Sequence, residues 1–194
     1  NILSLKKRFK KIDVHDHHKA HAASAYFYSG WKKCNILTMD GWGDNYSSKL
    51  YFANNGKMNL ISKTSSLDSL GYFYGSITKL LGFKPHRHEG KILGLAAFGN
   101  YKKAYSFISK MISYDKTNKC FKGNFEKGLY LSKFENPNIQ FLKKKFNRED
   151  IAAAAQKRIE EVILEFVSDN IKKDTRLALA GGVFSNVKIN QKIS

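Results

Sequence analysis

The chain has 194 residues, of which 42% are apolar and 13% aromatic, a composition typical of a folded protein rather than a disordered one. No run approaches the roughly 18 consecutive apolar residues of a membrane-spanning helix, so a membrane protein is not expected. Lys plus Arg (34) exceeds Asp plus Glu (16) by 18 charges, but the excess is mostly dispersed lysine, and we do not expect a nucleic-acid partner.

The N-terminal part predicts a short strand at 12–15 and then a helix that runs to Ser29. Asp16 is a suitable N-cap for this helix, and Gly30 is a suitable residue to end it. Small residues of high helix propensity fill the run from 20 to 25, without Pro or Gly.

Two histidines of this helix form a candidate metal site with a downstream carboxylate. His17 and His21 are four residues apart, about 6 Å along a helix axis and on one face, whereas His18 points about 100° away. Asp40 follows a predicted buried strand at 35–39, which would place its carboxylate opposite the two imidazoles. Such a set with open positions suits divalent iron or zinc. Surface decoration or helix capping is the alternative for the histidine pair.

A Gly-x-Gly turn follows this aspartate. Gly41 and Gly43 would let backbone N–H groups approach an anion such as a phosphate, although a plain hairpin turn is the alternative. Two further strands are predicted at 46–53 and 57–63, joined by the Asn-Gly turn at 54–56.

The middle of the chain predicts helices at 69–81 and 101–112, separated by a polar loop at 86–91. Within this loop, Glu89 and Lys91 could hold a hydroxyl acceptor or a phosphate. The alternative is a solvated ion pair worth less than about 1 kcal/mol.

The pattern changes between 113 and 146, where short apolar pieces alternate with Lys, Asn and Gly, as in an inserted loop or small hairpin. A long helix is predicted at 151–171, with Asn147 as its cap.

A strand at 176–180 then leads into a double glycine and a helix start. This arrangement lets a nucleotide lie against the backbone at Gly181 and Gly182, with Asn186 as a hydrogen-bonding partner. Tight packing of strand against helix is the alternative.

Five blocks occur in the order HHKAHAASAYFYSG, LTMDGWGD, SLGYFYGSITKLLGF, HEGKILGLAAFG and LALAGGVFSNVKINQKI. In this order they resemble the carbamoyltransferase family, the O-carbamoyltransferases of nodulation-factor and antibiotic biosynthesis. The resemblance covers most of the chain except the stretch from about 113 to 146. It implies an α/β fold of the sugar kinase/actin-like (ribonuclease H-like) type, a mixed sheet with flanking helices. It also implies a relationship to the tRNA threonylcarbamoyladenosine-forming enzymes.

The resemblance further implies an enzyme that uses ATP with Mg to activate carbamoyl phosphate as carbamoyl-adenylate. The carbamoyl group would then pass to a hydroxyl of a sugar or secondary metabolite. A tRNA threonylcarbamoyl-type transferase and a non-catalytic ATP-binding module remain alternatives.

The chain lacks an initiator Met and stops just past a motif, so we expect 1–194 to be an internal fragment of a longer cytoplasmic protein. The resemblance implies flanking N-terminal strands, a fourth metal-ligating Asp beyond the double glycine and a C-terminal carbamoyl-phosphate domain, none of which is expected within 1–194. The fragment alone is therefore expected to be inactive. Cys34 and Cys120 are expected to be free buried thiols in a reducing compartment.

Overall fold

A computed structural model describes residues 9, 11–124, 126 and 137–194. The strands are β1 (Lys33–Gly43), β2 (Tyr46–Asn54), β3 (Lys57–Ser65), β4 (Ile112–Asp115), β5 (Cys120–Gly123) and β6 (Leu177–Ala180). The helices are α2 (His17–Ser29), α3 (Leu70–Leu80), α4 (Glu89–Ala96), α5 (Tyr101–Ile108), α6 (Leu142–Lys145), α7 (Arg148–Asn170) and α8 (Val187–Ile193). Three short 3₁₀ turns are η1 (Ser66–Asp68), η2 (Pro137–Ile139) and η3 (Gly182–Ser185).

The larger sheet has four strands in the order β3-β2-β1-β6. The first three strands form an antiparallel meander, while β6 pairs in parallel with β1, so the sheet is mixed. The register places Thr38 beside Ala180; β1 continues to Gly43, whereas β6 ends at Ala180 and leads into η3. This pairing brings the start of η3 next to Asp40, whose carboxylate accepts a hydrogen bond from the Gly182 amide.

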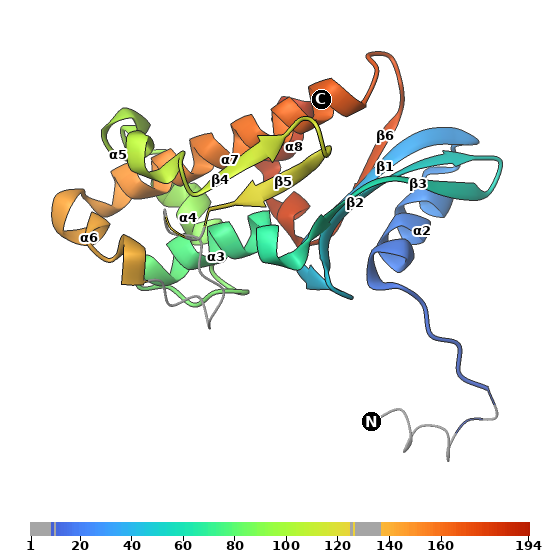
Figure 1. Cartoon of the computed structure of the whole chain (residues 1–194), viewed down its shortest axis with the longest axis horizontal. Coiled ribbons are helices and arrows are strands. Elements are labelled where there is room, and N and C mark those ends of the chain that lie inside the picture. The colour runs from blue at the N-terminus through green and yellow to red at the C-terminus, as the bar shows by residue number, and fades with distance from the viewer. Residues whose placement is uncertain (1–8, 10, 125, 127–136) are drawn as a thin grey trace.

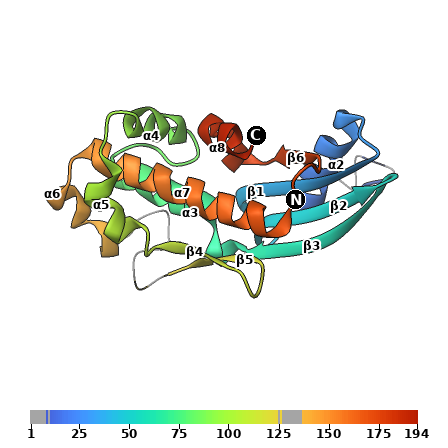
Figure 2. The ribbon, with the colours of Figure 1, turned by 90° about the horizontal axis from the view of Figure 1, so that it is seen from above.

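Helices cover both faces of this sheet (Figures 1 and 2). Side chains alternate along a strand, so Ile36 packs with Ala22 and Tyr26 of α2, while Leu37 packs into the larger core on the opposite face. That larger core also contains α3 and α7. The α/β class and the mixed sheet with flanking helices are confirmed.

The predicted helix ends largely agree with the structure. Gly30 adopts the left-handed conformation at the end of α2 (φ 68°), as its predicted role as a helix stop requires. Asn147 caps α7 by accepting a hydrogen bond from the Asp150 amide at 2.9 Å. The predicted Asn-Gly turn is also confirmed, because Asn55 and Gly56 both have positive φ (47° and 82°).

Four local predictions were wrong. Gly41 and Gly43 form no turn of their own, because both lie within β1 and the turn follows at Asp44 and Asn45. Residues 12–15 form no strand; Val14 is 74% exposed, and no sheet edge lies beside it in the described part of the chain to pair with it. The polar loop ends early, because α4 begins at Glu89. Helix α5 ends at Ile108 rather than 112, because Ile112 pairs with Gly123 as the start of β4.

The segment 113–146 contains the expected small hairpin, formed by β4 and β5. Phe121 of this hairpin is fully buried, with its ring centroid 5.0 Å from that of Phe166 in α7. Ile139 and Leu142 are also buried. The described parts of this segment therefore contribute to the main core; residues 125 and 127–136 lie outside the described part, including the predicted apolar pieces there.

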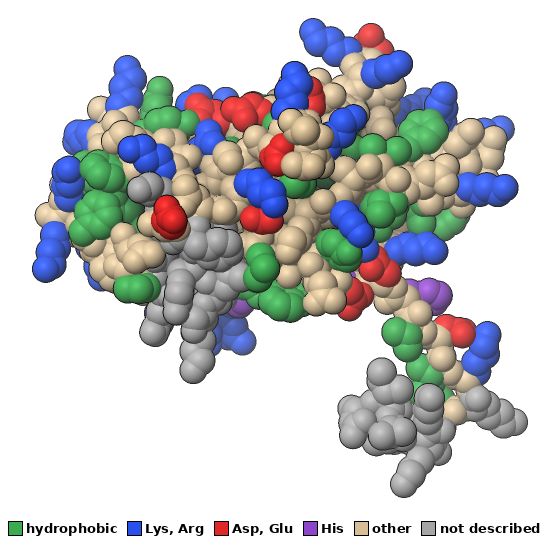
Figure 3. Space-filling view, in the orientation of Figure 1, with side chains coloured by type: hydrophobic (Ala, Val, Ile, Leu, Met, Phe, Trp, Pro, Cys, Tyr) green, Lys and Arg blue, Asp and Glu red, His purple; other side chains and the backbone are tan. Residues whose placement is uncertain are grey.

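The surface is rich in cations. On the face shown in Figure 3, Lys and Arg side chains are spread among polar and hydrophobic groups rather than gathered over one element. Among the described residues, no helix combines the length and apolar character needed to cross a bilayer.

Candidate metal centre and adjoining pocket

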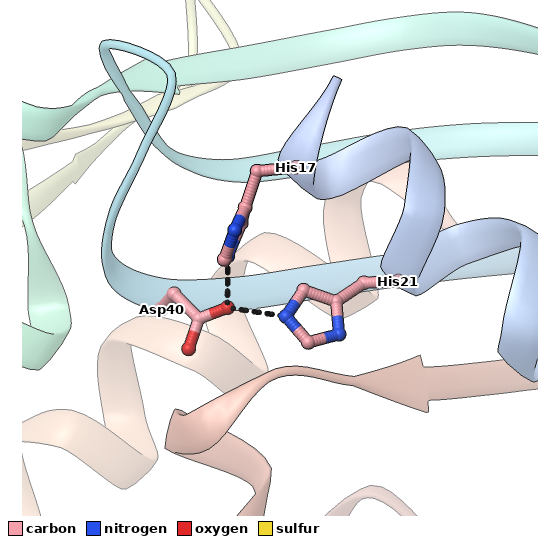
Figure 4. A group of neighbouring side chains, drawn as sticks. All are labelled: His17, His21 and Asp40. Atoms are coloured by element: carbon pink, nitrogen blue, oxygen red, sulfur yellow. Dashed lines mark hydrogen bonds and ion pairs between the residues drawn. The ribbon is translucent and has the colours of Figure 1, made fainter. Parts of the chain in front are cut away.

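Asp40 is the residue at which the candidate site converges. It lies near the end of β1, with its side chain 18% exposed. One carboxylate oxygen, Oδ1, accepts a hydrogen bond from the Gly182 amide at 2.7 Å. The other oxygen, Oδ2, lies 3.1 Å from Nε2 of His17 and 3.1 Å from Nε2 of His21 (Figure 4). The carboxylate thus joins α2 to the start of η3.

The spacing of these three side chains fits coordination of one metal ion. Their ligand atoms all lie within 4.8 Å of one another. Ligands about 2.1 Å from a metal, at tetrahedral or octahedral angles, lie about 3.0–3.4 Å apart, which matches both His–Asp distances. Two imidazole nitrogens and one carboxylate oxygen are a donor set suited to divalent iron or zinc.

The N-terminus of α2 is held in place by carboxylates. Asp16 Oδ1 accepts from the Lys19 amide at 2.8 Å, which confirms Asp16 as the N-cap. Asp16 Oδ2 lies 2.7 Å from the ammonium of Lys49, a residue only 7% exposed. Asp44 accepts from the His17 amide at 2.7 Å. These bonds determine where the first turn, and with it the His17 ring, lies against the sheet.

His18 anchors the same turn from the inner side of the helix. It is fully buried; its Nε2 donates to the Tyr46 carbonyl at 3.0 Å, and its Nδ1 lies 2.9 Å from the Thr38 hydroxyl. Burial is the main cause that lowers the pKa of His18, so the ring is neutral near pH 7. The prediction that His18 points away from the candidate ligands is confirmed.

Two glycines make room for this arrangement. A Cβ on Gly43 would lie within van der Waals overlap of the His17 ring, 2.2 Å from Cδ2. A Cβ on Gly71 would lie 2.7 Å from the backbone nitrogen of Gly41, so α3 can approach the end of β1 only without a side chain there.

A pocket of about 440 Å³ adjoins the cluster and shares Asp40 with it. Its volume lies in the range of about 300–1,000 Å³ of small-molecule sites. The lining residues come from the end of β1, from α3, α4 and α7, and from the segment after β6: Asp40, Gly41, Gly71, Tyr74, His86, Arg87, Glu89, Gly90, Leu93, Ile159, Gly182, Val183, Ser185 and Asn186.

A buried network of hydrogen bonds joins two lining residues of the pocket, Tyr74 and Asn186, to α7. Tyr74 donates to Gln156 Oε1 at 2.8 Å, and the Asn186 amide donates to the same oxygen at 2.9 Å. Gln156 in turn donates to Glu160 at 2.7 Å. Burial, with the nearby carboxylates of Glu160 and Glu89, raises the pKa of Tyr74, so this hydroxyl remains a hydrogen-bond donor.

Comparison with known proteins agrees with the motifs. The family model described as Carbamoyltransferase N-terminus matches residues 1–194. The chain belongs to this family.

Relatives of this carbamoyltransferase N-terminal region include an uncharacterized protein of Methanocaldococcus jannaschii, 32% identical over 97% of the chain and 34% of that protein. Nodulation protein NolNO of Sinorhizobium fredii is 27% identical over 94% of the chain and 27% of its own length. Nodulation protein NolO of Bradyrhizobium diazoefficiens is 26% identical over 92% of the chain and 33% of its own length. The chain spans about a third of the length of such relatives.

The structure brings together most of the residues singled out from the sequence. The three candidate metal ligands converge, and of the others Gly41, Gly182, Asn186 and Glu89 line the pocket. Three do not line it: Gly43 lies against His17, Gly181 (φ 98°) lies against the Met39 carbonyl, and the Lys91 ammonium lies 5.5 Å from the Phe83 ring centroid.

Sequence reasoning missed several lining residues in this carbamoyltransferase region. Tyr74 lies within one of the five blocks that resemble the family, but no local pattern singled out its side chain. Arg87 and Ser185 adjoin residues that were singled out, so proximity to Glu89 and Asn186 was the available signal.

Proposed function

We propose that the chain is part of an O-carbamoyltransferase. Water converts carbamoyl phosphate to carbamate and inorganic phosphate, and a carbamate oxygen then attacks the α-phosphorus of ATP, which releases pyrophosphate and gives carbamoyl-adenylate. A hydroxyl of a small molecule or sugar takes the carbamoyl group and loses its proton, and AMP leaves. One observation carries this proposal: in a chain of the carbamoyltransferase family, His17, His21 and Asp40 converge at the edge of a pocket lined by Gly182 and Asn186. The hydroxyl compound that accepts the group is not specified by these residues.

The three ligands would hold a divalent metal, iron or zinc, with positions left open for a substrate. Such an ion would polarise a carbonyl and offset negative charge on phosphate oxygens. The protein's own part is to keep the ligand atoms converged. Asp40 Oδ1 accepts a hydrogen bond from the Gly182 amide, and the backbone N–H of His17 donates to the Asp44 carboxylate.

The adjoining pocket would hold the nucleotide. Leu93, Ile159 and Val183 offer apolar surface for a base, while Asn186 offers an amide whose orientation is set by Gln156. Glu89 lies in the same pocket, where its carboxylate accepts from the His86 amide at 2.6 Å. We propose that Glu89 contacts the substrate. Lys91, which does not line the pocket, would contact the substrate only outside it.

The order β3-β2-β1-β6, a three-stranded meander followed by a parallel strand, is consistent with the sugar kinase/actin-like fold that forms part of this proposal. In a protein as long as these relatives, the remaining two thirds would supply the carbamoyl-phosphate domain. A cytoplasmic location is included, because Cys34 and Cys120 are both free thiols.

The test uses the full-length protein with ATP, carbamoyl phosphate and a panel of sugars. Pyrophosphate release and a carbamoylated product, detected by mass spectrometry, are expected. His17→Ala, His21→Ala and Asp40→Asn should each lose bound metal and activity. His15→Ala, an exposed histidine two residues before the cluster, should keep both.

Two results would reject the proposal in different ways. Unchanged metal content in His17→Ala and His21→Ala would remove the metal site. Nucleotide binding without any pyrophosphate or carbamoylated product across the panel would instead favour an ATP-binding module.

A further inference from the structure

A short turn before α4 carries a side chain that neither the motifs nor the metal cluster accounts for. Residues 84–88 form this turn, which is closed by hydrogen bonds from the Lys84 amide to His88 Nδ1 (3.2 Å) and from the His86 amide to Glu89 Oε1 (2.6 Å). His86 has φ +64°, in the left-handed region that is uncommon for residues other than Gly. Strained backbone of this kind clusters at functional sites, and here it presents Arg87 at the edge of the pocket.

Arg87 differs from the other arginines of the described chain. Arg148 donates to the Leu81 carbonyl, Arg158 donates to the Ile112 carbonyl, and Arg176 lies over the Trp31 ring. The Arg87 guanidinium is exposed and has no ion pair or hydrogen bond with any described residue, so its five donors are free to meet a ligand.

The charge balance of the pocket favours an anion at this position only through Arg87. Two carboxylates, Asp40 and Glu89, line the pocket, and both would repel a phosphate. Arg87 is the single permanently charged cation among the lining residues. A guanidinium matches the oxygens of a phosphoryl group in a bidentate geometry, which a lysine cannot reproduce.

We propose that Arg87 binds the phosphoryl group of the ligand in this pocket and thereby selects phosphorylated ligands over uncharged ones, an inference that rests on the proposed nucleotide site. With a divalent metal (+2) on Asp40, the charges of Asp40, Glu89, Arg87 and the ion sum to +1, which favours the phosphate. Without Arg87 the same sum is zero, and the pocket loses this attraction.

The experiment measures binding of ATP, AMP and adenosine to the metal-loaded full-length protein by titration calorimetry at constant ionic strength. Arg87→Gln should lower the affinity for ATP and AMP about ten- to a hundredfold and change the affinity for adenosine by no more than about twofold, because only the charged contact is removed. Arg87→Lys should recover part of the loss. Lys84→Gln is the matched control, since it removes an exposed cation from the same turn that does not line the pocket.

Each outcome decides the inference. ATP binding unchanged in Arg87→Gln would overturn it, and so would an equal loss of ATP and adenosine, which would mean that Arg87 only shapes the pocket. If the unaltered protein binds neither nucleotide nor adenosine, the proposed nucleotide site fails. In that case inorganic phosphate and carbamoyl phosphate are titrated: weaker binding in Arg87→Gln sustains the anion-binding role, and equal binding overturns it.

Discussion

Asp16→Asn isolates the contribution of the buried ion pair that holds the first turn of α2. Asparagine is as good an N-cap as aspartate, so the bond to the Lys19 amide is retained and only the charge opposite Lys49 is lost. The Lys49 side chain is 8% exposed and that of Asp16 is 32% exposed, with 2.7 Å between the charged atoms.

Removing one partner of a fully buried pair costs about 3–5 kcal/mol. Because water reaches part of Asp16, we expect the free energy of unfolding to fall by about 2–3 kcal/mol. With a urea dependence of about 2 kcal/mol per M, the midpoint should fall by about 1–1.5 M. Circular dichroism during urea titration measures the shift. Asp13→Asn is the control, since its pair with Lys11 is 60% exposed on the aspartate side and should contribute little.

The same variant has a predicted pH signature. Burial alone would raise the pKa of Asp16, but hydrogen bonds from the Lys49 ammonium and the Lys19 amide, with the Lys49 charge, lower the pKa below its usual 3.8. The stabilisation is therefore fully present above pH 3.8 and is lost as the pH falls through the lower pKa of the folded state. The difference in the free energy of unfolding between the unaltered protein and Asp16→Asn should therefore disappear in acid. A midpoint shift no larger than that of Asp13→Asn at pH 7 would refute the reasoning.

Three further predictions concern packing around the site. Gly71→Ala should lower the affinities for metal and nucleotide together, because its Cβ would lie 2.7 Å from the Gly41 nitrogen and displace α3. Gly94→Ala is the control: open space surrounds Gly94, so both affinities should stay unchanged. Equal losses of affinity in the two variants would contradict the close approach of α3 to β1. Tyr74→Phe should lower the free energy of unfolding by about 1–2 kcal/mol, because the hydrogen bond to Gln156 is lost, and should weaken nucleotide binding. Thermal unfolding and calorimetry measure the two effects. An unchanged melting temperature would count against the polar network. Phe121→Ala should cost about 3–5 kcal/mol in urea unfolding because the ring is fully buried, and a cost near zero would mean that the β4–β5 hairpin is separable from the core.

The candidate metal ligands could be predicted because their signals are local. A four-residue spacing on a helix puts His17 and His21 on one face, and Asp40 comes near the end of the adjoining buried strand. The cap at Asp16 and the Asn-Gly turn are equally short-range. In each case the residues that decide the conformation lie within a few positions of one another.

What could not be predicted depends on partners distant in the sequence. The strand expected at 12–15 has suitable residues but no neighbouring strand to pair with. Gly43 was predicted to approach an anion, whereas its neighbour in the structure is the His17 ring, 26 residues away. The role of Lys49 follows from a pairing across 33 residues with Asp16. No local pattern reports such contacts.

The bond between Asp40 and the Gly182 amide spans 142 residues of chain, whereas Asp40 and His17 are only 23 apart. During synthesis on the ribosome, α2 and β1 emerge early and can bring the histidines and the carboxylate together long before β6 is made. The pocket cannot close until that last strand pairs with β1. The three side chains of the cluster can therefore converge early, whereas the pocket gains its complete lining only after the segment around Gly182 has folded against Asp40.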